Sequence, residues 1–164
     1  MRKVYDVISA VRNHFEYNDT FTNKVIFGDI DDVDLNKVQM FPLTQFWMQN
    51  STFNRRTIQF TLNFLFLDVV DDDNTNIKGG LFDLSKSGDS FFGNSNFIDV
   101  LNEQHSVATD FLVSLTDYRG ELAEQKYVLI GEPSAEMLYE KFENKLAGWG
   151  VSVTIEVPND TSVC

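Results

Sequence analysis

The chain has 164 residues, of which 43% are hydrophobic and 23% charged, so it can bury a core and is neither a disordered polar chain nor a fibrous one. Its formal net charge of -12 argues against a phosphate-gripping surface, because nucleic-acid affinity comes mainly from clustered Lys and Arg. We therefore expect a single globular domain over residues 1–164 without sequence-specific binding to nucleic acid.

The first elements in the chain are a helix and a short strand. Val4, Ile8, Val11 and Phe15 recur at helical spacing among polar residues, which predicts an amphipathic helix over residues 2–15. The β-rich residues 24–27 predict a strand, and Gly28 then leads into an acidic turn.

A long β-hairpin is predicted over residues 38–70. Residues 57–66 alternate cleanly, which is typical of a half-buried antiparallel strand. The apolar face consists of Ile58, Phe60, Leu62, Phe64 and Phe66, and the polar face of Thr57, Gln59, Thr61 and Asn63. Residues 38–49 are aromatic and β-prone but contain Pro42, which indicates an edge, a bulge or a strand start.

Residues 68–96 are rich in Asp, Asn, Ser and Gly and predict a long loop or an arm that orders on assembly. A second helix follows, with Asn96 as its N-cap and Gly120 at its end. Its predicted apolar stripe contains Ile98, Leu101, His105, Ala108, Leu112 and Leu115.

The last third of the chain contains two predicted strands with a segment between them that favours a helix. Residues 126–130 predict a short strand, and residues 151–157 alternate until Pro158. Residues 134–147 favour a helix beginning at Ser134, because Leu138, Phe142 and Leu146 are four residues apart, with an extended arm as the alternative. We predict an α+β fold in which a mostly antiparallel sheet of four to five strands packs against two or three helices.

Targeting signals are not recognisable in the chain. The single cysteine, Cys164, cannot form an intramolecular disulfide, and Met1-Arg2-Lys3 leads into a segment broken by Asp6 and Arg12 rather than into an apolar run. The longest apolar stretch, residues 64–67, is far shorter than the about 20 residues that span a bilayer. We expect synthesis in the cytosol and no membrane association.

A search for catalytic chemistry finds little. The acidic runs lack the Gly and Glu positions of a calcium loop, and zinc has only His14, His105 and a terminal cysteine as ligands. Ser90 is not presented by a buried strand, and phosphate-binding loops are missing from the sequence. We expect a protein that is not an enzyme, with no catalytic residue, cofactor or metal site.

Aromatic residues are the unusual feature, with 15 Phe in the chain. One core of this size does not hide so many rings, so some are expected to face a partner. The candidate interface residues are Phe41, Pro42, Trp47, Phe53, Phe82, Phe91, Phe92 and Trp149.

Two blocks of the sequence resemble tail-completion or tail-terminator ring proteins of tailed bacteriophages, including crAss-like phages. The first runs from FTNKVIFGDI (residues 21–30) through DLNK (34–37) to FPL (41–43). The second is LAGW (146–149) with the strand 151–157, Pro158-Asn159 and the terminal SVC (162–164).

The resemblance implies a structural virion protein of the neck or tail, made in the host bacterial cytoplasm. It would form a ring of six-fold or twelve-fold symmetry that contacts portal, connector or tail proteins and surrounds a channel for DNA. The acidic residues that would line this channel are Asp29, Asp31, Asp32, Asp34, Asp71, Asp72 and Asp73. The alternatives are a non-catalytic binding module of a cellular complex and, less favoured, a small hydrolase that uses Ser90 or His105.

Overall fold

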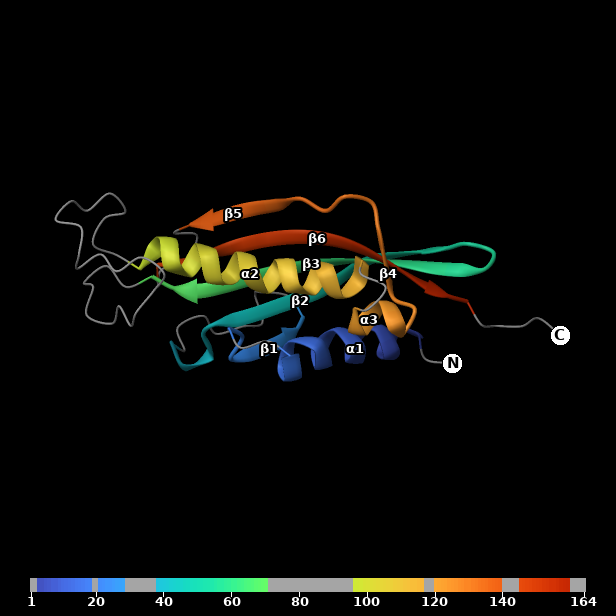
Figure 1. The fold of residues 1–164 in the computed structure, drawn as a ribbon, viewed down its shortest axis with the longest axis horizontal. Coiled ribbons are helices and arrows are strands. Elements are labelled where there is room, and N and C mark those ends of the chain that lie inside the picture. The colour runs from blue at the N-terminus through green and yellow to red at the C-terminus, as the bar shows by residue number, and fades with distance from the viewer. Residues whose placement is uncertain are drawn as a thin grey trace.

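The computed structural model of the chain describes residues 3–18, 21–28, 38–70, 96–116, 120–139 and 145–159. In chain order, the elements are α1 (Lys3–Asn18), β1 (Lys24–Phe27), the 3-10 helix η2 (Val38–Met40), β2 (Leu43–Phe53), β3 (Thr57–Val69), α2 (Phe97–Thr116), α3 (Glu121–Glu124), β4 (Val128–Ile130), β5 (Ala135–Tyr139) and β6 (Leu146–Pro158). Helices α1 and α2 pack side by side over one face of a mostly antiparallel sheet (Figure 1). The predicted α+β class is confirmed.

The sheet has six strands in the order β1-β2-β3-β6-β4, and β5 also pairs with β6. Only the β1–β2 pair is parallel among the described strands. β4 pairs with residues 154–156 of β6 and β5 with residues 147–151, so the two short strands follow one another along the same edge of β6. The structure has one strand more than the four to five predicted because residues 135–139, for which a helix was favoured, form β5.

Strands β2 and β3 form an antiparallel hairpin that is connected by residues 54–56. The Asn54 amide donates to the Thr57 carbonyl oxygen over 2.9 Å at this turn. The prediction that the hairpin begins at residue 38 is wrong, because residues 38–40 form η2 and β2 begins at Leu43. Pro42 has no amide hydrogen to add to the sheet, and its carbonyl oxygen accepts from the Asn23 and Lys24 amides at the start of β1.

The main core lies between the helices and one face of the sheet. The predicted alternation of β3 is confirmed, because Ile58, Phe60, Leu62, Phe64 and Phe66 are all buried in this core. The helices contribute Val7, Val11, Phe15, Val107, Ala108, Phe111 and Leu115, and β6 contributes Val151, Val153, Ile155 and Val157. Stacked and tilted rings of Phe15, Phe46, Phe64, Phe66 and Phe111 fill its centre. Much of the aromatic surplus is therefore core.

No described α-helix packs against the second face of the sheet, although Met40 of η2 packs against its apolar half. In its polar half, side-chain hydrogen bonds connect β3 to β6: Thr57 and Gln59 donate to the Glu156 carboxylate over 3.1 and 2.9 Å. Its apolar half is a smaller cluster that consists of Phe41, Leu43, Leu67, Leu138 and Leu146. The polar side chains lie half-buried, as the alternation of β3 predicts.

Helix α2 differs from its prediction. Its buried residues are Val100, Gln104, Val107, Ala108, Phe111, Ser114 and Leu115, so the predicted stripe shares only two positions with the true one. His105 is exposed rather than on the apolar stripe. The reason is that two polar residues, Gln104 and Ser114, occupy buried positions, which a hydrophobic pattern discards. Helix α2 ends at Thr116, and Gly120 lies directly before α3 rather than at the end of α2.

The predicted helix over residues 134–147 is wrong where the structure describes it. Residues 135–139 form β5, and Leu146 begins β6. Leu138 and Leu146 do meet in the smaller cluster, but from two neighbouring strands rather than from one helix face. Spacing alone does not distinguish these two arrangements. Of the predicted loop at 68–96, Asp68 and Val69 belong to β3 and residues 71–95 lie outside the described residues.

Candidate functional site

Among the predicted interface residues that the structure describes, the most exposed is Phe53, at the end of the hairpin. Its side chain is 74% exposed, and all residues from 50 to 56, which we call the hairpin tip, are exposed. The tip extends past both helices in Figure 1. Trp47 lies nearer the body of the sheet, half-buried, where β2 pairs with Asn63. The hairpin therefore presents a large apolar ring on a segment that contributes little to the core.

Two other predicted interface residues serve the fold. Phe41 is buried in the smaller cluster with Leu43, Leu67 and other residues. Pro42 is half-buried and holds the start of β1 through its carbonyl oxygen. The structure therefore separates these residues from Phe53, although the sequence groups them by residue type.

Trp149 lies on β6 and faces α2. Its indole Nε1 donates to the Leu101 carbonyl oxygen over 2.8 Å, and its ring meets the edge of the His105 ring at a centroid distance of 5.2 Å. His105 is also close to Thr109, one helical turn later. Trp149 thus links α2 to the sheet, and His105 packs on it at the surface.

The remaining predicted site residues lie outside the described residues. They are the candidate interface residues Phe82, Phe91 and Phe92 and the candidate channel residues Asp29, Asp31, Asp32, Asp34, Asp71, Asp72 and Asp73.

The two edges of the sheet carry exposed apolar side chains that the sequence reasoning missed. On one side these are Phe21 and Phe27, next to and in β1. On the other side, the β4–β5 edge (residues 128–139) exposes Val128, Ile130, Met137 and Tyr139. Strands of three to five residues are too short for a clear alternating pattern, so only strand pairing identifies these residues as edge residues.

Two acidic side chains lie where β3 meets α2. Burial raises the pKa of Asp68 to about 6, against the lowering effect of the Val69 amide, which donates to Asp68 Oδ1 over 2.7 Å. The Glu103 carboxylate raises it further. Burial, and then the charge of Asp99, also raises the pKa of Glu103. The ionised carboxylates of Asp68 and Glu103 therefore repel one another near neutral pH.

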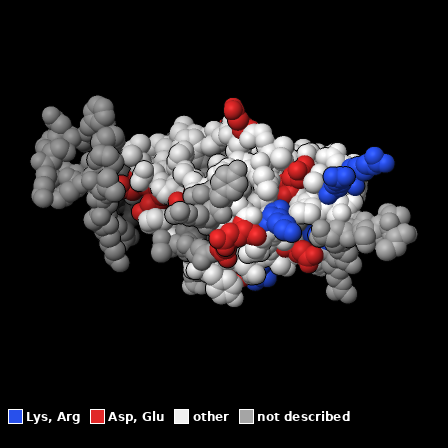
Figure 2. Space-filling view, turned by 45° about the vertical axis from the view of Figure 1, so that its right-hand side comes forward, with Lys and Arg blue, Asp and Glu red and all other residues white. Residues whose placement is uncertain are grey.

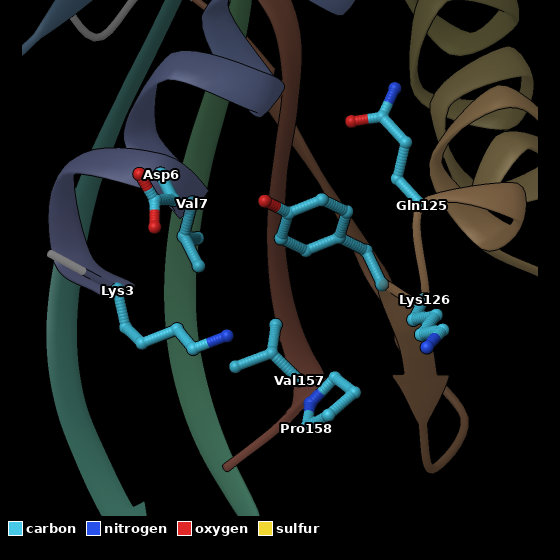
Figure 3. Close-up of a pocket in the computed structure, with 8 residues that line it drawn as sticks. Lys3, Asp6, Val7, Gln125, Lys126, Val157 and Pro158 are labelled. Atoms are coloured by element: carbon cyan, nitrogen blue, oxygen red, sulfur yellow. The ribbon is translucent and has the colours of Figure 1, made fainter. Parts of the chain in front are cut away.

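A small pocket lies between α1, the segment after α3 and the end of β6. Figure 3 shows Lys3 and Asp6 from α1 on one side, Gln125 and Lys126 on the other, and residues of β6 between them. Burial, and then the Asp6 charge, raises the pKa of Tyr127, which also lines the pocket. The volume of the pocket, about 80 Å³, is well below the roughly 300–1,000 Å³ of small-molecule sites.

The described residues show neither a membrane-spanning helix nor a cluster of metal ligands. No described helix has the length and apolarity that would let it cross a bilayer. The described ranges contain no group of three or more His, Cys, Asp and Glu side chains that could hold a metal ion. Comparisons of the sequence with protein-family models and with curated proteins found no match.

Proposed function

We propose that the protein is a structural subunit of a bacteriophage neck or tail, in which identical copies form a closed ring. The ring joins the components above and below it and surrounds a channel for DNA. The proposal is supported by the resemblance of residues 21–43 and 146–164 to phage tail-completion and tail-terminator proteins, together with the surfaces described above.

The carrying observation is that exposed apolar side chains lie at two unlike places, one aromatic ring at the hairpin tip and four side chains on the β4–β5 edge. Phe53 is 74% exposed at the first, and Met137 is 52% exposed at the second. Isolated exposed apolar residues are normal, but strand edges with such residues favour pairing with another chain. A closed ring needs a heterologous interface, in which one patch of a subunit meets a different patch of the next.

The charge of the chain suits passage of DNA. A formal net charge of -12 produces a negative field around the subunit, and a ring of such subunits multiplies it. Repulsion of the phosphate backbone would let DNA slide through the channel without adhering to the wall. This repulsion follows from the net charge of the subunit, whichever acidic residues line the channel.

Ring formation is tested by measuring the mass of the assembly that the purified chain forms. Native mass spectrometry and light scattering are expected to give one discrete high oligomer, and electron microscopy is expected to show rings with a central hole. An antibody against the chain is expected to label the neck or tail of the phage particles that encode it. A chain that is monomeric at every concentration and leaves these particles unlabelled contradicts the proposal, whereas discrete rings outside a virion support assembly alone.

A further inference from the structure

The hairpin tip carries two arginines that form no ion pair within the described part of the chain. Arg55 and Arg56 are exposed, and neither forms an ion pair with another described residue. Blue side chains lie at the right-hand end of the molecule in Figure 2, on the side where the hairpin projects in Figure 1. The tip is thus a small basic and aromatic surface on a chain whose net charge is strongly negative.

The β4–β5 edge has the opposite charge. Glu132 and Glu136 are both exposed there, and within the described ranges neither takes part in a salt bridge. Exposed Ile130 and Met137 lie beside them on β4 and β5. The edge therefore combines apolar contact area with two negative charges, which complements the tip in both respects.

The arginines of the tip lie far from Glu136 of their own chain. Glu136 pairs with Gly150 of β6, whereas Thr57, which follows Arg56, pairs with Pro158. These two positions on β6 are about 26 Å apart, because a strand rises about 3.3 Å per residue. An arginine side chain does not cover that distance, so within the described residues Glu136 can meet these arginines only in another molecule.

We propose that the hairpin tip of one subunit docks on the β4–β5 edge of the next subunit, with Phe53 against the apolar side chains of the edge and Arg55 and Arg56 against Glu132 and Glu136. This interface rests on the proposed ring function and specifies how its subunits meet. Complementary charge matters here because strongly acidic copies otherwise repel one another. Pro133 and the glutamates discourage indiscriminate strand pairing at the same edge, which leaves the basic tip as the matching partner.

Charge reversal tests this docking. The tip variant Arg55→Glu/Arg56→Glu and the edge variant Glu132→Arg/Glu136→Arg are each expected to raise the concentration for half-assembly at least tenfold. In an equimolar mixture, each negative tip meets a positive edge and each positive tip meets a negative edge. The mixture is therefore expected to assemble near the wild-type concentration, with the two variants alternating around the ring. Light scattering reports assembly, and circular dichroism reports the fold.

The controls are Arg12→Glu on α1 and Asp110→Arg on α2, two exposed charge reversals away from both surfaces. Both are expected to assemble like the wild type. Wild-type assembly by both reversed variants, or a folded mixture that stays unassembled, overturns the docking and leaves the ring itself standing. A wild-type chain that never assembles overturns the ring function and the docking together.

Discussion

Two polar side chains, the half-buried Asp68 and the buried Gln104, affect the stability of the contact between α2 and the sheet. Asp68 is held by the Val69 amide but faces the charge of Glu103. Gln104 is fully buried on α2, and neither its Oε1 nor its Nε2 has a hydrogen-bond partner among the described residues. Both residues reduce the stability of the contact that they occupy, in different ways.

The Asp68→Asn variant is expected to be more stable than the wild type at pH 8, by up to about 3 kcal/mol. The pKa of Asp68 is raised from 3.8 to about 6 in the folded chain, so the folded state binds the proton more tightly than the unfolded state. The cost of ionisation is absent below the lower pKa and is complete above the higher one. Stability therefore falls as pH rises through this window, and the variant removes that fall.

Urea unfolding at pH 4 and at pH 8 measures this effect. The two proteins are expected to be nearly equal at pH 4. Asp110→Asn, an exposed position on α2, serves as the control and is expected to change little at either pH. An Asp68→Asn variant that is less stable than the wild type at pH 8 would show that the ionised carboxylate has a favourable partner.

The Gln104→Met variant is expected to raise the free energy of unfolding by about 1–3 kcal/mol, because it removes a buried amide without a partner and keeps a similar volume. Gln45→Met is the matched control, since Gln45 Nε2 donates to the Gly28 carbonyl oxygen over 2.9 Å and the substitution removes that bond. Thermal unfolding of both variants gives the comparison. If Gln104→Met is instead destabilising, the amide makes hydrogen bonds beyond the described contacts.

At the scale of elements, β6 is the strand that pairs with three others. It pairs with β3 along its whole length on one side and with β4 and β5 on the other. Gly148 pairs with Leu67 of β3, and a Cβ at this position would be 1.7 Å from the Phe66 carbonyl oxygen. Gly150, two residues later, has room, because its Cβ would be 3.6 Å from the nearest atoms of Leu65 and Leu138.

The Gly148→Ala variant is expected to lose more than about 3 kcal/mol of stability, because a backbone oxygen cannot move away without separating β6 from β3. Gly150→Ala is expected to stay within about 1 kcal/mol of the wild type. Chemical unfolding followed by circular dichroism distinguishes the two variants. Equal stability of the two would mean that the strands can shift to make room at Gly148.

At the scale of the whole molecule, the two-layer fold leaves one sheet face and both sheet edges without a covering α-helix among the described residues. The face is satisfied internally, since Thr57, Gln59 and Glu156 hydrogen-bond to one another across β3 and β6. The edges carry Phe27 on one side and Met137 and Tyr139 on the other, all exposed. The places available for assembly are therefore the strand edges and the hairpin tip, rather than the polar face.

The sequence predicted those elements whose pattern is a property of a single strand or helix. The alternation of β3 and β6 is visible in the chain because burial on one face repeats at the period of the backbone itself. The helix α1 was also predicted, but of its predicted stripe Val4 is exposed, and the buried Val7 was missed. The same reasoning fails for α2, where Gln104 and Ser114 occupy buried positions. It also fails for residues 135–139, where the spacing of Leu138 and Leu146 fits a helix as well as two adjacent strands.

The sequence by itself determined the fold class and the acidic charge, and it named Phe53 only as one of eight candidate interface residues. Only the tertiary structure decided that β4 and β5 form an edge, that Arg55 and Arg56 lie far from Glu132 and Glu136, and that Phe41 belongs to the core. The physical reason is that an edge is defined by the strands that pair beside it. In this chain the deciding pairs join residues as distant in sequence as Thr57 and Pro158, which no local pattern encodes.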